Sequence, residues 1–236
     1  VCDERIMDHI YYSKNVLDAG TLTNLQQICL EKFNEIPTYN FARKTEQPRN
    51  YLEEVIRNLI GYDNHVEYWV RDSTEATLFH VDANELAAKM ARAKYETEDP
   101  EMVKEFPLNT HILYIYIDPK MEKGDLILLP NQEYIIGRPI LDTDFEPLEG
   151  QEMFIIKPKT NHMVLFDKPI YHAVSAVENR NIVKHRLALM FSSWRKIPSV
   201  YKKHHHWSND IPTGKTMYNT TGLYEPVPME FKNFTI

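Results

Sequence analysis

The sequence has little glycine and cysteine, and it has no long apolar or basic run. Only seven glycines occur among 236 residues, against 14 tyrosines, 10 phenylalanines and three tryptophans. This composition is typical of a strand-built core and excludes a glycine-rich linker or fibre. Two cysteines, Cys2 and Cys29, are too few for a disulfide framework or a cysteine metal site, and we expect Cys29 to be a buried helix thiol. No apolar run reaches the roughly 18 to 20 residues of a membrane helix.

The net negative charge limits the kinds of molecule that the protein is expected to bind. With 27 Lys and Arg against 34 Asp and Glu, the formal charge is −7, which disfavours extended contact with nucleic-acid phosphates. The sequence predicts a soluble, cytoplasmic protein with neither a nucleic-acid nor a membrane partner, and it leaves the oligomeric state open. The first residue is Val1, so a removed targeting segment stays open, and the sequons at Asn219 and Asn233 would matter only in a secretory compartment.

Two N-terminal segments carry apolar residues at helical spacing. Residues 21–36 are expected to form a helix with Thr21 or Thr23 as its N-cap, and residues 51–61 a second helix that ends at Gly61. The predicted apolar face of the first helix consists of Leu22, Leu25, Cys29, Leu30 and Phe33.

Short β-branched and aromatic runs separated by turn residues dominate the middle of the chain. The eight runs are VEYWV, ATLFHV, HILYIYI, LILL, MFII, MVLF, YHAVSAV and RLALMF. Because no helical pattern alternates with them, they favour an antiparallel sandwich or barrel over a parallel sheet. One segment, residues 83–105, is rich in Ala, Glu, Lys and Met and predicts a charged helix and loop inserted after the second β run.

We therefore predict a mainly β protein with a single domain over residues 1–236. Its parts are a helical N-terminal layer (1–65), a β core (66–195) and an irregular C-terminal segment (196–236).

Three residues have the chemistry of a metal site. His80 and Asp82 stand two apart at the end of a predicted strand, so an imidazole and a carboxylate can share one face. His172 begins another β run about ninety residues later. Two histidines and one carboxylate on one side of a metal leave three open positions, as in non-haem Fe(II) oxygenases.

A basic residue follows at the start of the last β run. Arg186 opens RLALMF, where alternate residues point into the core. A guanidinium is costly to bury unless an anion meets it, and its planar fork suits a carboxylate. Arg180, Lys184 and His185 are alternatives for this role, but Arg186 is favoured because it begins the apolar strand.

The order of His-x-Asp, distal His and downstream Arg resembles the Fe(II)- and 2-oxoglutarate-dependent dioxygenases, in particular the prolyl-4-hydroxylase-like branch. HILYIYID with the following EKGDL turn, and IIKPKTNHMVLFDKPIYHAVSAV, resemble further segments of that family. The likeness covers about residues 66–195. It implies a double-stranded β-helix (jelly-roll) with the N-terminal helices packed on it.

The resemblance also implies an activity and the residues that carry it. His80, Asp82 and His172 would hold Fe(II), Arg186 would pair with the distal carboxylate of 2-oxoglutarate, and Tyr114 would hydrogen-bond that carboxylate. O2 would be the second co-substrate. An unactivated C–H bond of a small molecule or an amino-acid side chain would be hydroxylated, with release of succinate and CO2.

Several other residues allow both a functional and a purely structural interpretation. Tyr114 and Tyr116 are expected to share a strand face. His111 and His162 are rival ligands that we interpret as ordinary edge histidines. His204 to His206 read as a polar loop. Four residues flank His80 and Asp82 in the sequence: Trp69, Arg71, Asn84 and Glu85. They would either face a substrate or be solvated.

Two rival functions remain open at this point. The segment Gly124–Pro130 fits a G-x5-P cupin element, so a metal-dependent cupin isomerase or a non-catalytic sugar-binding jelly-roll is an alternative, although the cupin His-x-His is missing. A silent scaffold for protein interaction is the other. For the enzyme, residues 83–105 are expected to act as a lid over the site.

Overall fold

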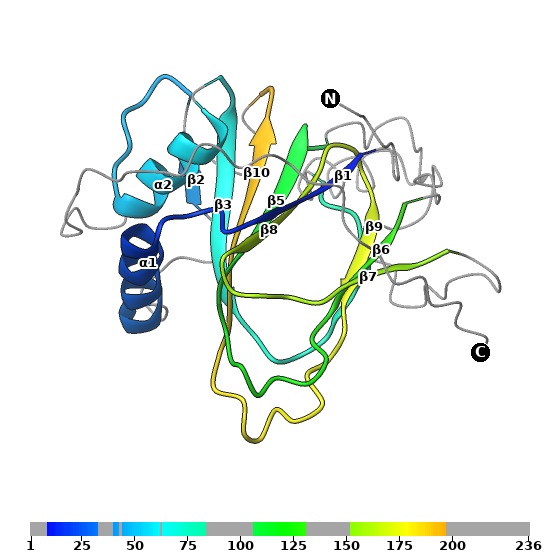
Figure 1. Ribbon diagram of the computed structural model, residues 1–236. Coiled ribbons are helices and arrows are strands. Elements are labelled where there is room, and N and C mark those ends of the chain that lie inside the picture. Colours follow the sequence, from blue (N-terminus) through cyan, green and yellow to red (C-terminus); the bar gives the residue numbers. More distant parts are fainter. Residues whose placement is uncertain are drawn as a thin grey trace, which may run out of the picture.

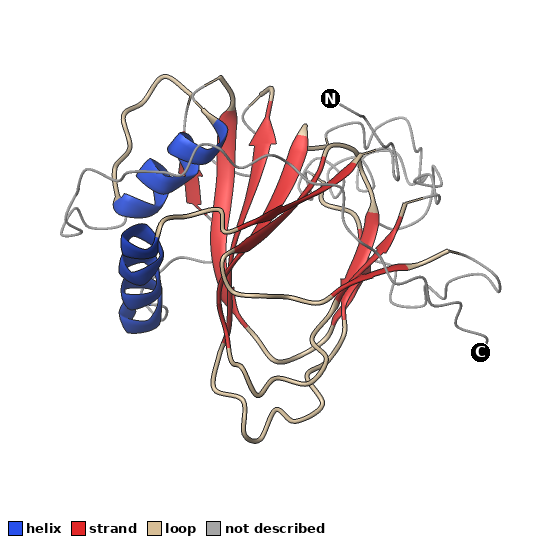
Figure 2. Cartoon of the chain, viewed as in Figure 1, coloured by secondary structure: helices blue, strands red, loops and turns tan. Residues whose placement is uncertain are grey.

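Two antiparallel sheets face each other in the computed structural model (Figures 1 and 2). The structure describes residues 9–32, 40–42, 44–61, 63–83, 106–130 and 152–196. The larger sheet consists, in spatial order, of β1 (Ile10–Lys14), β8 (His162–Phe166), β5 (Asn109–Ile117), β10 (Arg186–Trp194), β3 (His65–Asp72) and β2 (Asn40–Ala42). The smaller sheet consists of β4 (Thr77–His80), β9 (Tyr171–Val174), β6 (Leu126–Leu129) and β7 (Phe154–Ile156).

The order of the strands is that of a double-stranded β-helix. From β3 onward the chain crosses to the smaller sheet for β4, returns for β5, crosses again for β6 and β7, and alternates through β8, β9 and β10. All strand pairs are antiparallel. The eight predicted runs are the strands β3 to β10, so the predicted mainly β, jelly-roll fold is confirmed.

The segment predicted as a helical layer also contributes two strands. β1 pairs with β8 and β2 pairs with β3, so both extend the larger sheet at its edges. β1 escaped prediction because only Ile10 and Tyr12 alternate in it before a polar stretch, and β2 has only three residues.

Both predicted helices lie on the outer face of the larger sheet (Figure 1). α1 (Ala19–Lys32) begins two residues earlier than expected. Its N-cap is Asp18 and not the predicted Thr21 or Thr23. Asp18 Oδ1 accepts hydrogen bonds from the backbone N–H groups of Gly20 (2.9 Å) and Thr21 (3.0 Å). Leu30, predicted to face the core, is 38% exposed, because the buried positions recur every four residues.

α2 (Tyr51–Ile60) begins and ends as its sequence predicts. Asn50 caps it by accepting from the Glu53 backbone N–H at 3.0 Å. The Glu53 carboxylate accepts in turn from the backbone N–H of Arg49, the residue before the N-cap, at 2.8 Å. Gly61 ends the helix with φ of +77°, and its N–H donates to the Arg57 carbonyl oxygen. A side chain would be strained in this left-handed backbone conformation.

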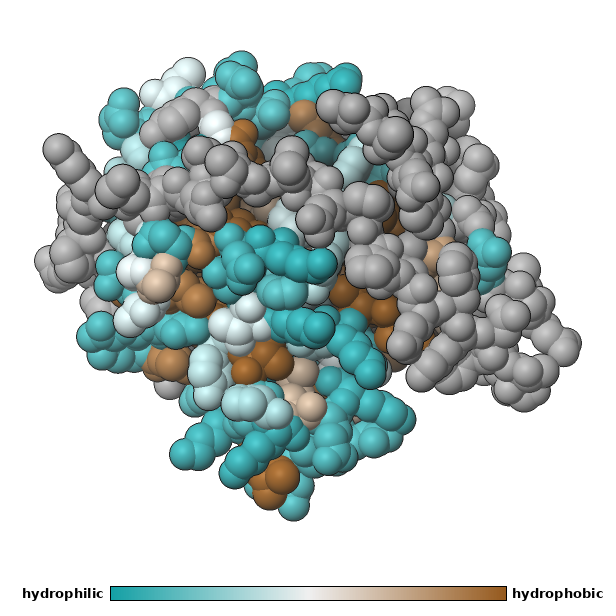
Figure 3. Space-filling view, in the orientation of Figure 1, coloured by the Kyte–Doolittle hydropathy of each residue, from teal (hydrophilic) through white to brown (hydrophobic). Residues whose placement is uncertain are grey.

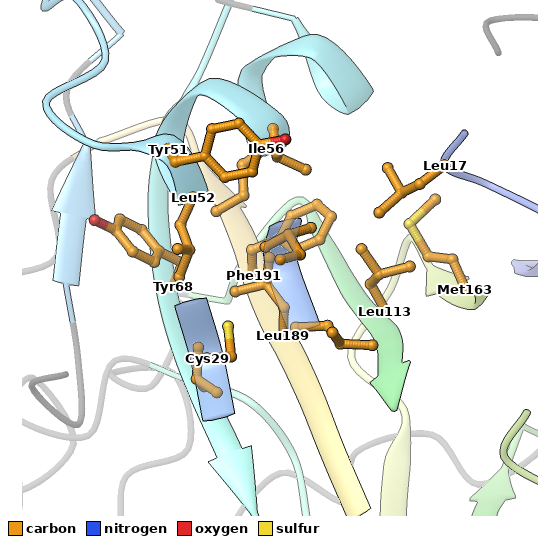
Figure 4. Packing of buried hydrophobic residues seen from close by; sticks show 14 of the residues in the cluster. Leu17, Cys29, Tyr51, Leu52, Ile56, Tyr68, Leu113, Met163, Leu189 and Phe191 are labelled. Atoms are coloured by element: carbon orange, nitrogen blue, oxygen red, sulfur yellow. The ribbon is translucent and has the colours of Figure 1, made fainter. Parts of the chain in front are cut away.

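One apolar cluster joins the helices to the sheet. Cys29 of α1 and Leu52 and Ile56 of α2 pack with outward-facing side chains of the sheet, among them Leu189 and Phe191 (Figure 4). Each such fully buried side chain contributes about 1.5–3 kcal/mol. Burial raises the pKa of the Cys29 thiol to about 12, so this cysteine is an inert core residue, as predicted.

A second apolar cluster fills the space between the sheets. Its members come from both inner faces: Ile10, Tyr12, Ile112, Tyr114, Leu126, Leu128, Phe154, Ile156, Val164, Phe166, Ile170 and Ala188. On the face of the molecule in Figure 3 the described residues are mostly hydrophilic, and apolar side chains show between them in small areas. No helix among the described residues is long and apolar enough to cross a membrane.

A buried carboxylate of α2 allows a test of how this helix is held on the sheet. Glu53 is 1% exposed and accepts hydrogen bonds from the Arg49 guanidinium (2.6 Å) and the Tyr68 hydroxyl (2.8 Å). Glu53→Ala removes the acceptor of both groups, so we expect the free energy of unfolding to fall by about 3 kcal/mol. Urea denaturation measures this. Glu31→Ala on the exposed side of α1 is the control and should cost less than about 0.5 kcal/mol; equal losses would contradict the role of Glu53.

Candidate metal centre

Pairing between two strands of the smaller sheet brings the predicted ligands together. His80 ends β4, and His172 lies opposite it in β9, with the ring centroids 4.2 Å apart. Asp82 follows His80 by two residues, and its Oδ1 lies 3.8 Å from His80 Nε2 and 3.9 Å from His172 Nε2. The three residues are therefore neighbours, as the sequence predicts.

Backbone carbonyl groups orient both imidazole rings. His80 Nδ1 lies 2.8 Å from the Leu78 carbonyl oxygen, and His172 Nδ1 lies 3.0 Å from that of Ile170. Because a carbonyl oxygen can only accept, each Nδ1 carries the proton and each Nε2 keeps its lone pair. Both lone pairs belong to the nitrogen atoms nearest Asp82, the form in which histidine binds a metal.

The donor set fits a divalent cation. One donor atom from each residue lies within 4.8 Å of the other two, and no other such group of His, Cys, Asp or Glu occurs in the described parts of the chain. An ion about 2.1 Å from each ligand holds two of them no more than roughly 4.2 Å apart, and the two Nε2 to Oδ1 distances lie below that limit. His172 Nε2 is buried and has no hydrogen-bond partner among the described residues. Burial first, and then the nearby His80, lower the pKa of His172, so its imidazole is neutral and able to bind a metal.

The carboxylate of Asp82 is also anchored to the other sheet. The Thr110 hydroxyl of β5 donates to Asp82 Oδ2 at 2.9 Å. Because β5 belongs to the larger sheet, the site lies between the two sheets. Sequence reasoning did not identify Thr110, although it occupies the inward-facing register of Ile112 and Tyr114.

Arg186 lies on the inner side of β10 and is 4% exposed. Its Nε donates to the Gly124 carbonyl oxygen at 3.1 Å, and its Cζ lies 5.7 Å from the centre of the Tyr114 ring. Within the described residues its guanidinium forms no ion pair. Burial lowers the pKa of Arg186, but a guanidinium still stays charged at neutral pH. A buried, charged fork without an acidic partner is suited to bind an anion.

Tyr114 completes this second part of the site. Its hydroxyl is buried and has no hydrogen-bond partner in the described part of the chain, and burial raises its pKa to about 12. A neutral phenol is a hydrogen-bond donor, so Tyr114 and Arg186 offer donors in the same region.

The expectation that Tyr116 shares the face of Tyr114 is wrong. The pairing of β5 with β10 shifts between Leu187 and Ala188, so that Tyr114 lies opposite Ala188 while Tyr116 lies opposite Leu187. This bulge reverses the alternation of side chains. Tyr116 consequently packs with the outer cluster under the helices.

The turn that holds Arg186 requires a glycine. Gly124 has φ of +76°, and a Cβ on it would approach Val177 Cγ2 to 3.0 Å. Its carbonyl oxygen is the acceptor for Arg186 Nε, so the turn positions the guanidinium.

The rivals of Arg186 lie on the outside. Arg180 is exposed and pairs with Glu75 at 2.8 Å. Lys184 is exposed. His185 Nδ1 contacts Asp72 Oδ2 at 2.6 Å at a half-buried position, on the side of Tyr116. The structure therefore leaves Arg186 as the buried candidate among the four.

The rival histidines lie apart from the three candidate ligands. His111 is not an edge residue but is 2% exposed, and it stacks on Phe191 in β10, whose side chain belongs to the outer cluster. His162 begins β8, where it lies opposite Tyr114 and contacts the Tyr12 hydroxyl through Nδ1. Tyr12 was not identified from the sequence because β1 was not.

The buried His111 makes the apoprotein sensitive to acid. Burial lowers its pKa to about 4 in the folded state, whereas an unfolded histidine has a pKa of about 6.5. Between these values the unfolded state binds the extra proton, so stability falls as the pH falls. When the pH falls from 7 to 4.5, we expect the wild type to lose about 2 kcal/mol more of its free energy of unfolding than His111→Phe does, measured by urea unfolding at both pH values. Identical acid losses would contradict this.

Two of the flanking residues turn inward. Trp69 and Arg71 of β3 lie opposite Met190 and Ala188 of β10, and these partners pack in the inner cluster. Cross-strand partners share a face, so both residues point into the space between the sheets. The other predicted features, namely Asn84, Glu85, the remainder of the 83–105 insertion, His204 to His206, Cys2, Phe33 and both sequons, lie outside the described residues.

Comparison with known proteins identifies the fold class as that of the iron- and 2-oxoglutarate-dependent oxygenases. No protein-family model and no curated protein matches the chain. Among similar solved structures is the epimerase SnoN in complex with Fe3+, alpha ketoglutarate and nogalamycin RO, with 12% identity, a TM-score of 0.53 and coverage of 91% of this chain and 94% of that chain.

Two further structures are similar. The alpha ketoglutarate-dependent carbocyclase SnoK has 12% identity, a TM-score of 0.52 and coverage of 82% and 84%. A Pseudomonas putida prolyl-4-hydroxylase has 11% identity, a TM-score of 0.47 and coverage of 82% and 96%. At these identities the likeness concerns the fold alone. The two structures with TM-scores above 0.5 confirm at that level the resemblance to the iron- and 2-oxoglutarate-dependent oxygenases.

Proposed function

We propose that the protein is an Fe(II)- and 2-oxoglutarate-dependent oxygenase that oxidises a C–H bond of a small molecule or an amino-acid-type substrate and releases succinate and CO2. The observation that carries this proposal is the convergence of two imidazole Nε2 atoms and one carboxylate oxygen between the sheets, with the buried Arg186 on the inner face of the same barrel.

His80, Asp82 and His172 are proposed to hold the iron. Backbone carbonyl groups orient the two imidazole rings, and the Thr110 hydroxyl holds Asp82, so the ligand atoms are fixed before a metal binds. Three protein ligands leave three positions of an octahedral ion open. When bound, the ferrous ion and 2-oxoglutarate would carry out the chemistry with O2, while the protein would position the reactants and exclude water.

Arg186 and Tyr114 are proposed to bind the distal carboxylate of 2-oxoglutarate. The guanidinium can give two parallel hydrogen bonds from its terminal nitrogens, since its Nε is engaged by Gly124. The Tyr114 hydroxyl would then gain the hydrogen-bond partner that it lacks among the described residues. A carboxylate bound in this way fixes the direction in which the rest of the diacid points.

Hydroxylation is the outcome that we propose first for the oxidised C–H bond. The same ligand set is compatible with other outcomes, since the similar structures include an epimerase and a carbocyclase. The complex of SnoN with nogalamycin RO supports the small-molecule part of the proposal. We propose neither a nucleic-acid nor a membrane partner.

Succinate formation tests the proposed function. The metal-free protein would be given Fe(II), 2-oxoglutarate and O2, and 2-oxoglutarate binding would be measured in parallel by calorimetry with Mn(II) in place of Fe(II). We expect metal-dependent binding and slow succinate release in the wild type, and loss of both in His80→Ala. Arg186→Ala should keep the metal but lose 2-oxoglutarate. A protein that binds a metal but neither binds nor consumes 2-oxoglutarate would overturn the proposal and favour the cupin alternative.

A further inference from the structure

The two oxygens of the Asp82 carboxylate face different partners. Oδ1 lies 3.8 and 3.9 Å from the two imidazole Nε2 atoms, whereas Oδ2 accepts the hydrogen bond of Thr110 Oγ1 at 2.9 Å. The hydroxyl therefore holds Oδ2 away from the candidate metal position and leaves Oδ1 as the single oxygen that faces it.

A second hydroxyl group supports the first. Thr110 lies opposite Ser192 in the pairing of β5 with β10, and the two Oγ atoms are 3.4 Å apart. A carboxylate can only accept, so the one hydroxyl proton of Thr110 is directed to Asp82. Ser192 is consequently the donor in the longer contact, and the three groups form a chain that runs from Ser192 through Thr110 to Asp82.

Burial makes this chain a fixed part of the site. Thr110 and Ser192 are each 1% exposed, so water does not compete for their hydroxyl groups. They stand on the two central strands β5 and β10 of the larger sheet, whereas both histidines stand on the smaller sheet. These hydrogen bonds thus tie Asp82, the acidic member of the candidate ligand set, to the larger sheet.

Resting on the proposed function, we infer that Thr110 is a positioning residue that restricts Asp82 to one-oxygen coordination of the metal, with Ser192 as its support. A carboxylate binds a metal through either one or both oxygens. Two-oxygen binding would occupy a position that the co-substrate or O2 needs. The hydroxyl chain therefore keeps three positions open.

Metal binding by the apoprotein tests this role without any turnover. Mn(II) calorimetry would compare the wild type with Thr110→Val, which keeps the shape but loses the donor, and with Thr110→Ser, which restores it. Loss of a hydrogen bond to a ligand weakens metal binding by about 10- to 100-fold. We expect that weakening in Thr110→Val, near-wild-type affinity in Thr110→Ser and a smaller weakening, by about 3-fold, in Ser192→Ala.

A matched control exists in α1. The Thr21 hydroxyl also donates to an aspartate, Asp18, at 2.6 Å, and Thr21 is likewise buried. Thr21→Val should lower the unfolding temperature and leave the Mn(II) affinity unchanged. The visible absorption of bound Co(II), which depends on the number of ligands, should change in Thr110→Val but not in Thr21→Val.

The outcomes separate the two proposals. A wild type that binds no Mn(II) overturns the proposed function together with this inference. A wild type and a Thr110→Val variant with equal affinity and identical Co(II) spectra overturn the inference alone. If Thr110→Val does not fold, Thr110→Ser and Ser192→Ala decide: an affinity unchanged in Ser192→Ala and lost in Thr110→Ser contradicts the hydroxyl chain.

Discussion

Replacing His172 by glutamine should weaken the binding of Mn(II) or Fe(II) to the apoprotein by more than about 100-fold. Loss of a group that merely supports a ligand already costs about 10- to 100-fold, and His172 supplies a ligand atom itself. The side chain is 2% exposed, and its Nε2 has no hydrogen-bond partner within the ranges that the structure describes. The variant therefore removes a buried lone pair that is available to an ion. Calorimetry under anaerobic conditions measures the dissociation constant.

His111→Gln is the matched control for this change. His111 is equally buried, but it stacks on Phe191 under the helices. The His111→Gln variant should have a lower free energy of unfolding and the same metal affinity as the wild type. The assignment of His172 would fail if both variants bound the ion as the wild type does.

Replacing Arg186 by methionine should weaken binding of 2-oxoglutarate by about 1,000-fold and leave metal binding intact. Removing one partner of a buried, hydrogen-bonded charge pair costs about 2–5 kcal/mol, and about 4 kcal/mol corresponds to 1,000-fold. Calorimetry with the Mn(II)-loaded protein measures this. Methionine retains the apolar packing of the side chain, so the loss reports on the guanidinium.

A second ligand sharpens the test of Arg186. 2-Oxobutanoate has the same oxo-acid end as 2-oxoglutarate but lacks the distal carboxylate. The wild type should strongly prefer 2-oxoglutarate, and Arg186→Met should bind the two acids about equally. Arg180→Met, at the exposed pair with Glu75, should keep the wild-type preference. A preference that survives in Arg186→Met would assign the distal carboxylate to another cation.

The strand runs could be predicted because their signal is local. The β-branched and aromatic residues of a run such as HILYIYI are enough to predict a strand, whereas β1 and β2 depend on pairing with β8 and β3. The helix start was misplaced for a similar reason, because the first two helical residues, Ala19 and Gly20, carry no large apolar side chain that would extend the helical pattern back to Asp18.

The candidate site shows the same division between local and distant information. The spacing of His80 and Asp82 was visible in the sequence, but the position of His172 opposite His80 follows from strand register. The Tyr116 error came from a bulge that no residue type announces. Thr110 was missed because its role depends on Asp82, which comes from the other sheet.

The most direct test of the whole account is a crystal structure of the protein with Mn(II) and 2-oxoglutarate, in which anomalous scattering locates the ion. The account expects one ion bonded to His80 Nε2, His172 Nε2 and a single oxygen of Asp82, with the distal carboxylate of the diacid on Arg186. An ion bound elsewhere, or a diacid whose distal carboxylate does not meet Arg186, would contradict it.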